Sequence, residues 1–485
     1  MPEARSALGR RFLALARRNP RAAALIGPDG EVLADRGTLA SEAEALARSI
    51  PVEVAGGPVV VSLPNSPAMV RAFLGLRLAG VTVALADAAA TDLELTAAAE
   101  TLGAHALVTV PGRSGVGAVL ASAADLAFSR ADAGATDVPV GTAVLKLTSG
   151  SGGRPKAVAV SERQLIADSV QILRTMAIRP DDVTLAAIPL SHSYGLGSCL
   201  VPLLLVGTPL AFPVCALPAA LATTLERARV AHFPAVPAMI RALGRLPDLP
   251  RLASMRVCLT AGAPLAPRDA AAFHAATGHK VHVFYGSSEC GGITYDRSEH
   301  AVHDDGSVGT AMERVSVEVV DDDGRSVPCG VQGRVRVRSR AAALAVLPAC
   351  EADGALGGGV FLTGDLGQLD PSGRLTLTGR VSETLNVAGK KVHPDEVRRA
   401  IESVPGVVNA AVTGLPDRHR GELVAALVAV EPGSGLTVPS LLRACRDRLA
   451  PHKVPRRVVL VDQLPFSERG KLRRDAVLEL LRRVH

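Results

Sequence analysis

The stretch "LTSGSGGRPKAVAVS", residues 147–161, places three glycines and several hydroxyl side chains between two short apolar runs. Consecutive Gly, Ser and Thr residues can turn several backbone N–H groups towards one point, and such a nest binds phosphate oxygens. Lys156 adds a full positive charge near the end of the stretch. The GxxxxGK[ST] spacing of a Walker loop is absent. Taken alone, the stretch predicts either a phosphate-binding loop or a plain flexible hairpin.

Outward from this stretch, short apolar runs alternate with segments of helical length. This alternation is typical of a mostly parallel α/β sheet with covered faces. After about residue 305 the pattern changes to hairpin-like strands, as in "GQLDPSGRLTL" (367–377), where Asp-Pro-Ser-Gly supplies a turn. Beyond Arg380, helical and strand patterns predict a compact α+β unit. The strand-like runs of the first part are residues 59–63, 81–85, 143–148, 183–188, 255–260 and 280–285.

The composition predicts a chain with a large core and at least two domains, because 485 residues with 48% hydrophobic content exceed one compact unit. The seven cysteines form no CxxC pair and no metal-ligand spacing, which favours a reducing compartment and a cytoplasmic location. Residues 183–225 contain no Asp, Glu, Lys or Arg, but five prolines interrupt them. We therefore expect buried strands and helices there and no membrane span.

Positive charge is concentrated in the last part of the chain. From Arg380 to the end there are 19 Lys plus Arg against 12 Asp plus Glu, whereas the net charge of the whole chain is only +6. This excess predicts either a site for an anionic partner or substrate, or a solvated face rich in arginine. Without interleaved aromatic residues or a recognisable motif, nucleic-acid binding is not expected.

The motif "TSGSGGRPK" (148–156) resembles the phosphate-loop signature of the adenylate-forming superfamily, which includes the AMP-dependent acyl-CoA synthetases. Further motifs follow in the order that this family requires, and several motifs in a fixed order are more specific than any one of them. They are "AGAPL" (261–265), "YGSSE" (285–289), "TGD" (363–365), "GRVSETLNVAGKKVHPDEV" (379–397) and "PFSERGKLRR" (465–474).

The resemblance implies a two-domain fold and a two-step reaction. Residues 1–380 would form a large α/β domain of layered sheets with a β-rich subdomain, and residues 381–485 a small, mobile α+β domain. Such an AMP-forming acid–thiol ligase uses ATP and Mg²⁺ to convert a carboxylic acid into an acyl adenylate, and then transfers the acyl group to CoA. Two alternatives stay open, a ligase that loads a separate carrier protein's phosphopantetheine and a degenerate member that binds its ligands without turnover.

Roles for individual residues follow from the same resemblance. Lys471 matches the lysine that bridges the substrate carboxylate and the α-phosphate, and Glu289 matches the Mg²⁺-associated glutamate. Tyr285 would stack on adenine, and Asp365 would accept the ribose hydroxyls beside Arg380. The predicted ATP-binding residues are Thr148, Ser149, Gly150, Ser151, Gly153, Lys156, Gly262, Ala263, Pro264, Tyr285, Gly286, Ser287, Asp365 and Arg380.

The second step depends on the C-terminal part of the chain. The family's hinge aligns with Ser382, and Gly389 would line the pantetheine channel, because glycine permits close approach. Two positions depart from the family pattern. Gly152 replaces a threonine of the phosphate loop, and Asn386 replaces a lysine common after the hinge. The first change removes a hydroxyl from the phosphate loop, and the second removes a positive charge after the hinge.

The acyl pocket is assigned by the resemblance to residues 189–197 and 232–237, with the segments around Gly262 and Gly286. Members that activate amino acids place an Asp in the first segment, and a buried ammonium without such a partner is costly. The uncharged run there disfavours an α-amino acid and favours an aryl acid or a fatty acid of short to medium length. Tyr194 and Phe233 are the predicted pocket residues, and His192 is predicted close to the carboxylate or phosphate, or else as a packed core histidine.

Overall fold

The structure is a computed structural model, and it divides the chain into two compact units. The first unit comprises Met1–Val317, Arg336–Leu362 and Gly373–Leu375, and the second Glu318–Val335, Thr363–Ser372 and Thr376–His485. The boundary that we predict after Arg380 stays a prediction. Described residues are 6–51, 54, 57–113, 119–123, 125–131, 137–149, 155–301, 306–347, 355–381, 385–387, 390–392, 394–417, 421–449, 451–466 and 472–483.

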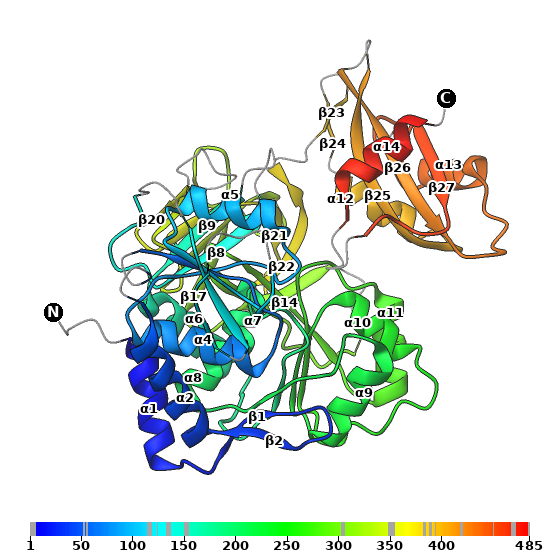
Figure 1. The fold of residues 1–485 in the computed structure, drawn as a ribbon. Coiled ribbons are helices and arrows are strands. Elements are labelled where there is room, and N and C mark those ends of the chain that lie inside the picture. The colour runs from blue at the N-terminus through cyan, green and yellow to red at the C-terminus, as the bar shows by residue number, and fades with distance from the viewer. Residues whose placement is uncertain are drawn as a thin grey trace. The chain divides into compact units, whose positions relative to one another are not determined.

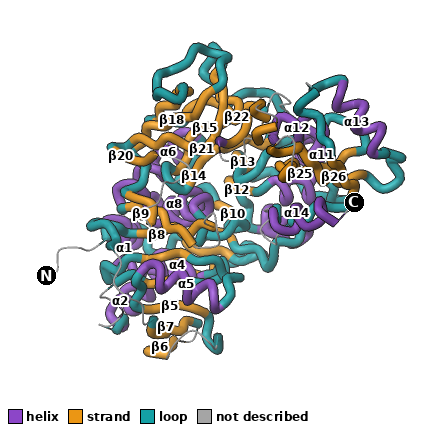
Figure 2. The backbone as a smooth tube through the Cα atoms, turned by 90° about the horizontal axis from the view of Figure 1, so that it is seen from above, coloured by secondary structure: helices purple, strands orange, loops and turns teal. Residues whose placement is uncertain are grey.

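One sheet of the first unit carries the "TSGSGGRPK" motif (Figure 1). Its centre is parallel, with β3 between β4 and β5 and with β8 beside β4. Strands β8 and β9 are antiparallel, and β7 and β6 continue the sheet beyond β5 (Figure 2). In order, the strands are β19 (Ala345–Leu347), β9 (Pro155–Val160), β8 (Val144–Ser149), β4 (Val83–Leu85), β3 (Val59–Val61), β5 (Ala106–Thr109), β7 (Leu126–Arg130) and β6 (Val119–Ala123).

The second sheet of this unit is parallel through β1, β11, β10, β12, β13 and β14, and antiparallel at both ends. All six predicted strand-like runs contain strands, but β8 and β14 are followed by the antiparallel strands β9 and β15 and not by helices. In order, its strands here are β16 (Ser307–Ala311), β15 (Gly291–Tyr295), β14 (Val281–Ser287), β13 (Val257–Thr260), β12 (His232–Ala235), β10 (Thr184–Leu185), β11 (Leu210–Ala211), β1 (Ala23–Ile26) and β2 (Val32–Asp35).

Helices bury the faces of these sheets in a core of small aliphatic side chains, with Phe12 and Phe73 among its largest fully buried members. The uncharged run 183–225 forms short strands and helices that are largely buried, as expected, whereas residues 214–217 are exposed. Within the described ranges, no helix has the length and apolar character needed to cross a membrane. The helices are α1 (Ala7–Arg18), α2 (Arg36–Ser49), α4 (Pro67–Leu78), α5 (Asp92–Leu102), α6 (Glu162–Thr175), α7 (Ser193–Gly195), the π-helix η1 (Leu196–Leu200), α8 (Val201–Val206), α9 (Pro218–Arg227), α10 (Pro237–Gly244) and α11 (Pro267–Thr277).

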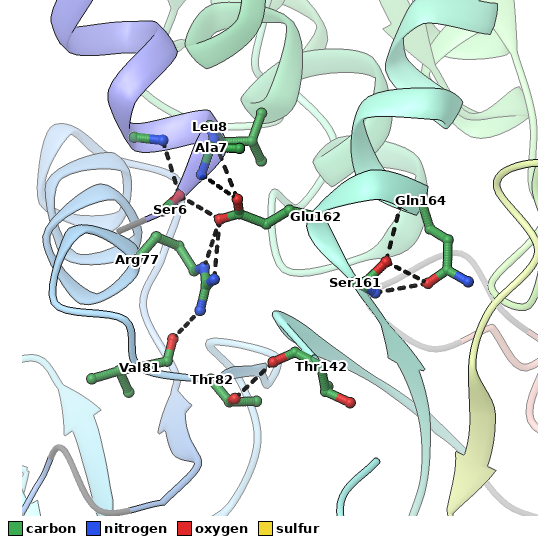
Figure 3. Close-up of polar contacts among 11 residues, drawn as sticks. Ser6, Ala7, Leu8, Arg77, Val81, Thr82, Thr142, Ser161, Glu162 and Gln164 are labelled. Carbon is green, nitrogen blue, oxygen red and sulfur yellow. Dashed lines mark hydrogen bonds and ion pairs between the residues drawn. The ribbon is translucent and has the colours of Figure 1, made fainter. Parts of the chain in front are cut away.

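A buried ion pair fixes the start of α1 against α6, the helix that follows the phosphate-loop motif and β9 (Figure 3). Glu162, the first residue of α6, accepts hydrogen bonds from Ser6 Oγ and from the backbone N–H groups of Ala7 and Leu8. Arg77 of α4 lies 3.0 Å from the same carboxylate. A carboxylate at a helix N-terminus satisfies N–H groups that have no partner within the helix. This contact joins three helices beside β9.

The second unit has a compact sheet with helices on both faces. Strand β26 pairs antiparallel with β25 and β23 and parallel with β27. Along β26, Val424, Ala426 and Val428 pack with α12 and α13, while Ala425 and Leu427 pack with α14. This alternation is the period-2 pattern of a strand buried on both faces. Its elements are β23 (Leu385–Val387), β24 (Lys390–Val392), α12 (Pro394–Glu402), β25 (Val407–Asp417), β26 (Gly421–Val430), α13 (Val438–Arg446), β27 (Arg457–Val461) and α14 (Arg474–Arg483).

Hairpin turns predicted after residue 305 are present in this unit. Asp321 N–H donates to the carbonyl of Arg325 at 2.9 Å, which closes the turn after β17. Asp370 Oδ1 accepts hydrogen bonds from Ser372 N–H at 2.9 Å and from Ser372 Oγ at 2.7 Å, in the predicted Asp-Pro-Ser-Gly turn. Strands β17 (Val315–Val320), β18 (Gly333–Ser339), β21 (Val360–Leu369) and β22 (Arg374–Arg380) contain residues of both units, and β20 (Ala355–Gly357) pairs with β21.

Candidate active site

The carboxyl ends of the parallel strands β12, β13 and β14 lie at one edge of their sheet, where ligands bind in open α/β sheets. Gly262, Ala263 and Pro264 follow β13 at this edge and are exposed. Gly262 has a φ of +87°, and a Cβ added to it would meet open space, so the left-handed backbone is what favours glycine here. Tyr285 is half-buried on β14 and pairs with Thr294 of β15. The predicted adenine-binding residues of this unit thus share one sheet edge.

Tyr194 spans the ends of two of these strands. Its hydroxyl lies 3.3 Å from the carbonyl oxygen of Ala235, the last residue of β12, and 3.4 Å from that of Leu259 in β13. Its ring lies 5.7 Å from that of Phe284. Burial raises the pKa of the Tyr194 phenol well above its usual range, so the group stays protonated and donates. Phe233, in contrast, is fully buried in the core below this edge.

His192 meets a carboxylate that comes from the other sheet. Its Nε2 lies 3.3 Å from Asp87 Oδ2, and the side chains are 34% and 12% exposed. Asp87 follows β4, whereas His192 follows β10 and precedes α7. The histidine is therefore a partly accessible group with an acidic partner, and the alternative of a packed core histidine is wrong.

Asn65 holds the segment that leads to His192. Its Nδ2 donates to the carbonyl oxygens of Ala186 at 2.7 Å and Ile188 at 2.8 Å, and its Oδ1 accepts from Leu190 N–H at 2.8 Å. Asn65 follows β3 of one sheet, and the segment follows β10 of the other. One amide side chain thus satisfies three backbone groups that have left the ladder of β10.

Glu289 lies in a turn between β14 and β15 that is held from several sides. Ser287 Oγ accepts from Cys290 N–H at 3.2 Å, and the carbonyl of Glu289 accepts from Ala343 N–H at 2.7 Å. Ser193 Oγ donates to Ser288 Oγ at 2.8 Å, which ties the turn to the segment of His192. Gly286 precedes these residues on β14, where an added Cβ would lie 2.7 Å from the backbone of the facing strand. The half-buried Glu289 side chain is therefore carried by a fixed backbone.

Two buried charges bracket the same turn. Lys146 on β8 is 4% exposed and donates to the carbonyl of Ser288 at 3.2 Å, while Asp168 on α6 is 5% exposed and accepts from Gly292 N–H at 2.9 Å. Burial lowers the pKa of the Lys146 amine and raises the pKa of the Asp168 carboxyl, and the attraction between the two charges opposes both shifts. This pair lies outside the predicted site residues.

The phosphate-loop motif begins and ends on adjacent strands. Thr148 of β8 pairs in register with Lys156 of β9, and the Lys156 side chain is half-buried. Ser149 pairs with Pro155 in the same ladder. The motif therefore joins two antiparallel strands, as both a phosphate-binding loop and a plain hairpin would. The predicted residues Gly150, Ser151 and Gly153, with the altered Gly152, lie outside the described residues.

In the second unit, the predicted ribose-binding pair is formed. Arg380 Nε lies 2.7 Å from Asp365 Oδ1, and the two side chains are 56% and 11% exposed. Asp365 N–H also donates to Thr363 Oγ1 at 3.0 Å, which orients the backbone of the "TGD" motif. The predicted Lys471, Gly389 and Ser382 lie outside the described residues, as does the side chain of Asn386.

A magnesium ion fits the chemistry of the Glu289 turn. Mg²⁺ keeps several waters and is usually bound by one or two carboxylates together with substrate phosphates. Glu289 offers one half-buried carboxylate next to the hydroxyls of Ser287 and Ser288. Across the described ranges, no group of three or more His, Cys, Asp and Glu side chains forms an all-protein metal cage. The residues present thus suit a metal ion that arrives with a nucleotide.

The sequence matches a known enzyme family over both units. Residues 12–345 match the family described as AMP-binding enzyme, and residues 396–471 match the AMP-binding enzyme C-terminal domain. The chain therefore belongs to the family of AMP-binding enzymes. The predicted family, fold class and enzyme class, an AMP-forming acid–thiol ligase, are confirmed.

Named relatives and solved structures agree with this assignment. The chain is 30% identical over 422 residues to the feruloyl-CoA synthase of an Amycolatopsis species, covering 84% of this chain and 86% of that protein. It is 30% identical over 336 residues to the long-chain-fatty-acid–CoA ligase FadD13 of Mycobacterium tuberculosis, covering 68% of this chain and 66% of that protein. The ATP-bound structure of MatB from Rhodopseudomonas palustris superposes with a TM-score of 0.83 at 25% identity, over 98% of this chain and 99% of MatB.

Proposed function

We propose that this protein activates a fatty or aryl carboxylic acid with ATP and Mg²⁺ and transfers the acyl group to CoA. The observation that carries the proposal is the hydrogen bond between Ser193 and Ser288, 2.8 Å long. It joins the segment predicted to bind the acyl substrate to the turn predicted to bind Mg²⁺ and ATP. A carboxylate beside His192 would therefore lie next to the turn that carries Glu289, which is the arrangement that adenylation requires.

The substrate class rests on the character of the segments near His192. Residues 183–225 contain no Asp, Glu, Lys or Arg, and the aromatic rings of Tyr194 and Phe284 pack together at the ends of the strands. These groups offer apolar surface and no built partner for an α-ammonium group within that run. The relatives that are named for feruloyl and fatty acyl groups support the same classes.

In the first step, a carboxylate oxygen of the acid attacks the α-phosphorus of ATP. A new bond forms between that oxygen and phosphorus, the bond from the α-phosphorus to the bridging oxygen breaks, and pyrophosphate leaves with the electron pair. Two unit charges 4 Å apart repel by about 4 kcal/mol at an effective dielectric constant near 20, which is about three decades of rate. We propose that Lys156, His192 and Lys471 offset this repulsion.

The predicted ATP-binding residues keep their expected roles in this proposal. Tyr285 and residues 262–264 would hold the adenine, and Asp365, beside Arg380, would accept the ribose hydroxyls. Glu289 would hold Mg²⁺ together with phosphate oxygens, and the ion, when bound, neutralises charge on the triphosphate. In the second step the CoA sulfur attacks the acyl carbon, the bond to the AMP oxygen breaks, and AMP leaves while the thiol proton is released.

The first test is pyrophosphate release from ATP and Mg²⁺ across a panel of aliphatic, aryl and amino acids, each with and without CoA. We expect release with one acid class, a CoA thioester as product and no release by Lys471→Ala. Release without a CoA product would favour a separate carrier protein as acceptor, which no described residue favours over CoA. No pyrophosphate release with any acid of the panel would contradict the proposal and favour a family member that binds nucleotide without turnover.

A reducing, cytoplasmic setting is part of the proposal, supported by the free thiols of the described cysteines.

A further inference from the structure

Asp87 is an acidic residue whose two carboxylate oxygens have separate roles. Oδ1 accepts a hydrogen bond from Ala89 N–H at 2.7 Å, which fixes the side chain within its own turn. The main-chain oxygen of Asp87 accepts from Ser62 Oγ at 2.8 Å, which fixes the backbone. Oδ2 then lies 3.3 Å from His192 Nε2. The carboxylate is thus held in place before it meets the imidazole.

The histidine side of this contact is also fixed. Asn65 binds three backbone groups of residues 186–190, just before His192, and Ser193 binds Ser288 just after it. The pair therefore joins the end of β4 in one sheet to the segment after β10 in the other. His192 remains 34% exposed, so the imidazole is accessible to a small ligand while one nitrogen faces Asp87.

We propose that Asp87 is a positioning residue that acts through His192 in adenylate formation. Its carboxylate accepts the Nε2–H of the ring, which fixes the ring orientation and leaves the other nitrogen for the substrate carboxylate or α-phosphate. When the ring carries both protons, its second N–H donates to these anions, which stabilises negative charge where the carboxylate and the α-phosphate meet. This inference rests on the proposed function and adds a residue to that site.

A double-mutant cycle tests whether Asp87 acts through His192. Acid-dependent pyrophosphate release is measured for the wild type, Asp87→Ala, His192→Ala and the double variant. We expect Asp87→Ala to lower kcat about tenfold, the size of one hydrogen bond to a charged group, with the KM for ATP little changed. Asp87→Ala should cause no further loss in the His192→Ala background, because the partner through which it acts is gone. An equal loss in both backgrounds would overturn the proposal.

Two further variants separate this role from a merely structural one. Asp87→Asn keeps an acceptor for Ala89 N–H but loses the charge, and we expect a kcat between those of the wild type and Asp87→Ala. Asp92 forms a comparable ion pair with Arg113, 2.7 Å long, five residues along the chain. Asp92→Ala is therefore the matched control and should leave kcat unchanged.

The protonation of the His192 ring can be measured by spectroscopy even if the protein shows no turnover. The ¹⁵N signals of the His192 ring, identified by their loss in His192→Ala, report which nitrogen carries the proton. We expect a protonated Nε2 in the wild type and a changed tautomer population in Asp87→Ala. Identical ring spectra in both proteins would overturn the role of Asp87. Absence of pyrophosphate release by the wild type with changed ring spectra would contradict the proposed function and leave the contact established.

Discussion

The Lys146 amine lies 3.2 Å from the carbonyl oxygen of Ser288, so a buried lysine on β8 is hydrogen-bonded to the turn that carries Glu289. Strand β8 also leads directly into the phosphate-loop motif. Asp168 supports the far side of the same turn through Gly292. Gly291, between them, has a φ of +70°, and an added Cβ would lie 2.3 Å from Asp168 Oδ1. The phosphate-loop motif and the turn of Glu289 are thus connected through the buried hydrogen bond of Lys146.

We predict that Lys146→Met destabilises the protein by about 3 kcal/mol, because it leaves Asp168 buried without its compensating charge. Removal of both charges in Lys146→Met with Asp168→Asn should cost less than the sum of the two single changes. Urea unfolding followed by circular dichroism measures each free energy of unfolding. Additive costs would show that the two charges do not stabilise one another.

Asn65→Ala should destabilise the protein by about 3 kcal/mol, roughly 1 kcal/mol for each of its three hydrogen bonds. It should also lower kcat for pyrophosphate release, since the segment that holds His192 loses its anchor. The neighbouring Ser66→Ala is the matched control, because Ser66 caps α4 at 3.3 Å from Met69 N–H. The loss of this cap should cost about 1 kcal/mol and no activity. Equal kcat values for Asn65→Ala and Ser66→Ala would argue against a positioning role for Asn65.

The order of motifs was sufficient to predict the family and the fold class, and the apolar runs were sufficient to predict the strands. Each predicted strand-like run was short and apolar, so the local signal and the burial agreed. Most of the runs lead into a helix, whereas β8 and β14 lead into antiparallel strands. Asp87 and Asn65 could not be assigned in the same way. Both lie within a few residues of the end of a buried strand, but a polar residue there is equally expected as a turn or cap residue. Only the packing of the two sheets brings them to the segment of His192.

Lys146 and Asp168 did carry a signal that could have been used. Lys146 is the one charged residue in the apolar run 143–148, and Asp168 occurs on the buried face of a helix with Leu165 and Ile172. A charge at an inward position predicts a buried partner, because an unpaired one is too costly. Which partner it finds depends on contacts between segments far apart in the chain. The spacing of the motifs therefore could not predict which buried side chains contact each other in the site.

His232 should make the protein less stable as the pH falls below about 6.5. Burial lowers the pKa of this imidazole from 6.5 to about 3, and its Nδ1 lies 3.2 Å from Thr184 Oγ1. The unfolded chain thus binds a proton between these pH values that the folded chain does not, and stability is lost as the pH decreases. His232→Asn, which keeps a polar group near Thr184, should remove this dependence between pH 6.5 and 5. The urea midpoint at several pH values measures it, and parallel curves for both proteins would contradict the assignment.

Tyr194 should limit the size of the acyl group, because its hydroxyl is bound at the ends of β12 and β13. Tyr194→Ala should raise the ratio of kcat/KM for longer or bulkier acids over shorter ones by about tenfold, the effect of roughly one methylene in an apolar pocket. Tyr194→Phe removes only the hydroxyl and should leave this ratio near that of the wild type. Rates of pyrophosphate release with a graded series of acids give both ratios. An unchanged ratio in Tyr194→Ala would place the acyl group elsewhere.

Lys471→Ala should abolish adenylate formation but spare thioester formation from supplied acyl adenylate. The predicted role of Lys471 is to offset the repulsion between the carboxylate and the α-phosphate, and that repulsion is no longer present once the adenylate has formed.

Lys453, which pairs with Glu396 at 2.6 Å in the second unit, provides a matched control. Lys453→Ala removes a lysine of the same unit at a cost of at most about 1 kcal/mol and should retain both half-reactions. Pyrophosphate release measures the first half-reaction, and CoA thioester formation from the synthetic adenylate measures the second. Equal loss of both in Lys471→Ala would contradict its assigned role and instead indicate a general function in the second unit.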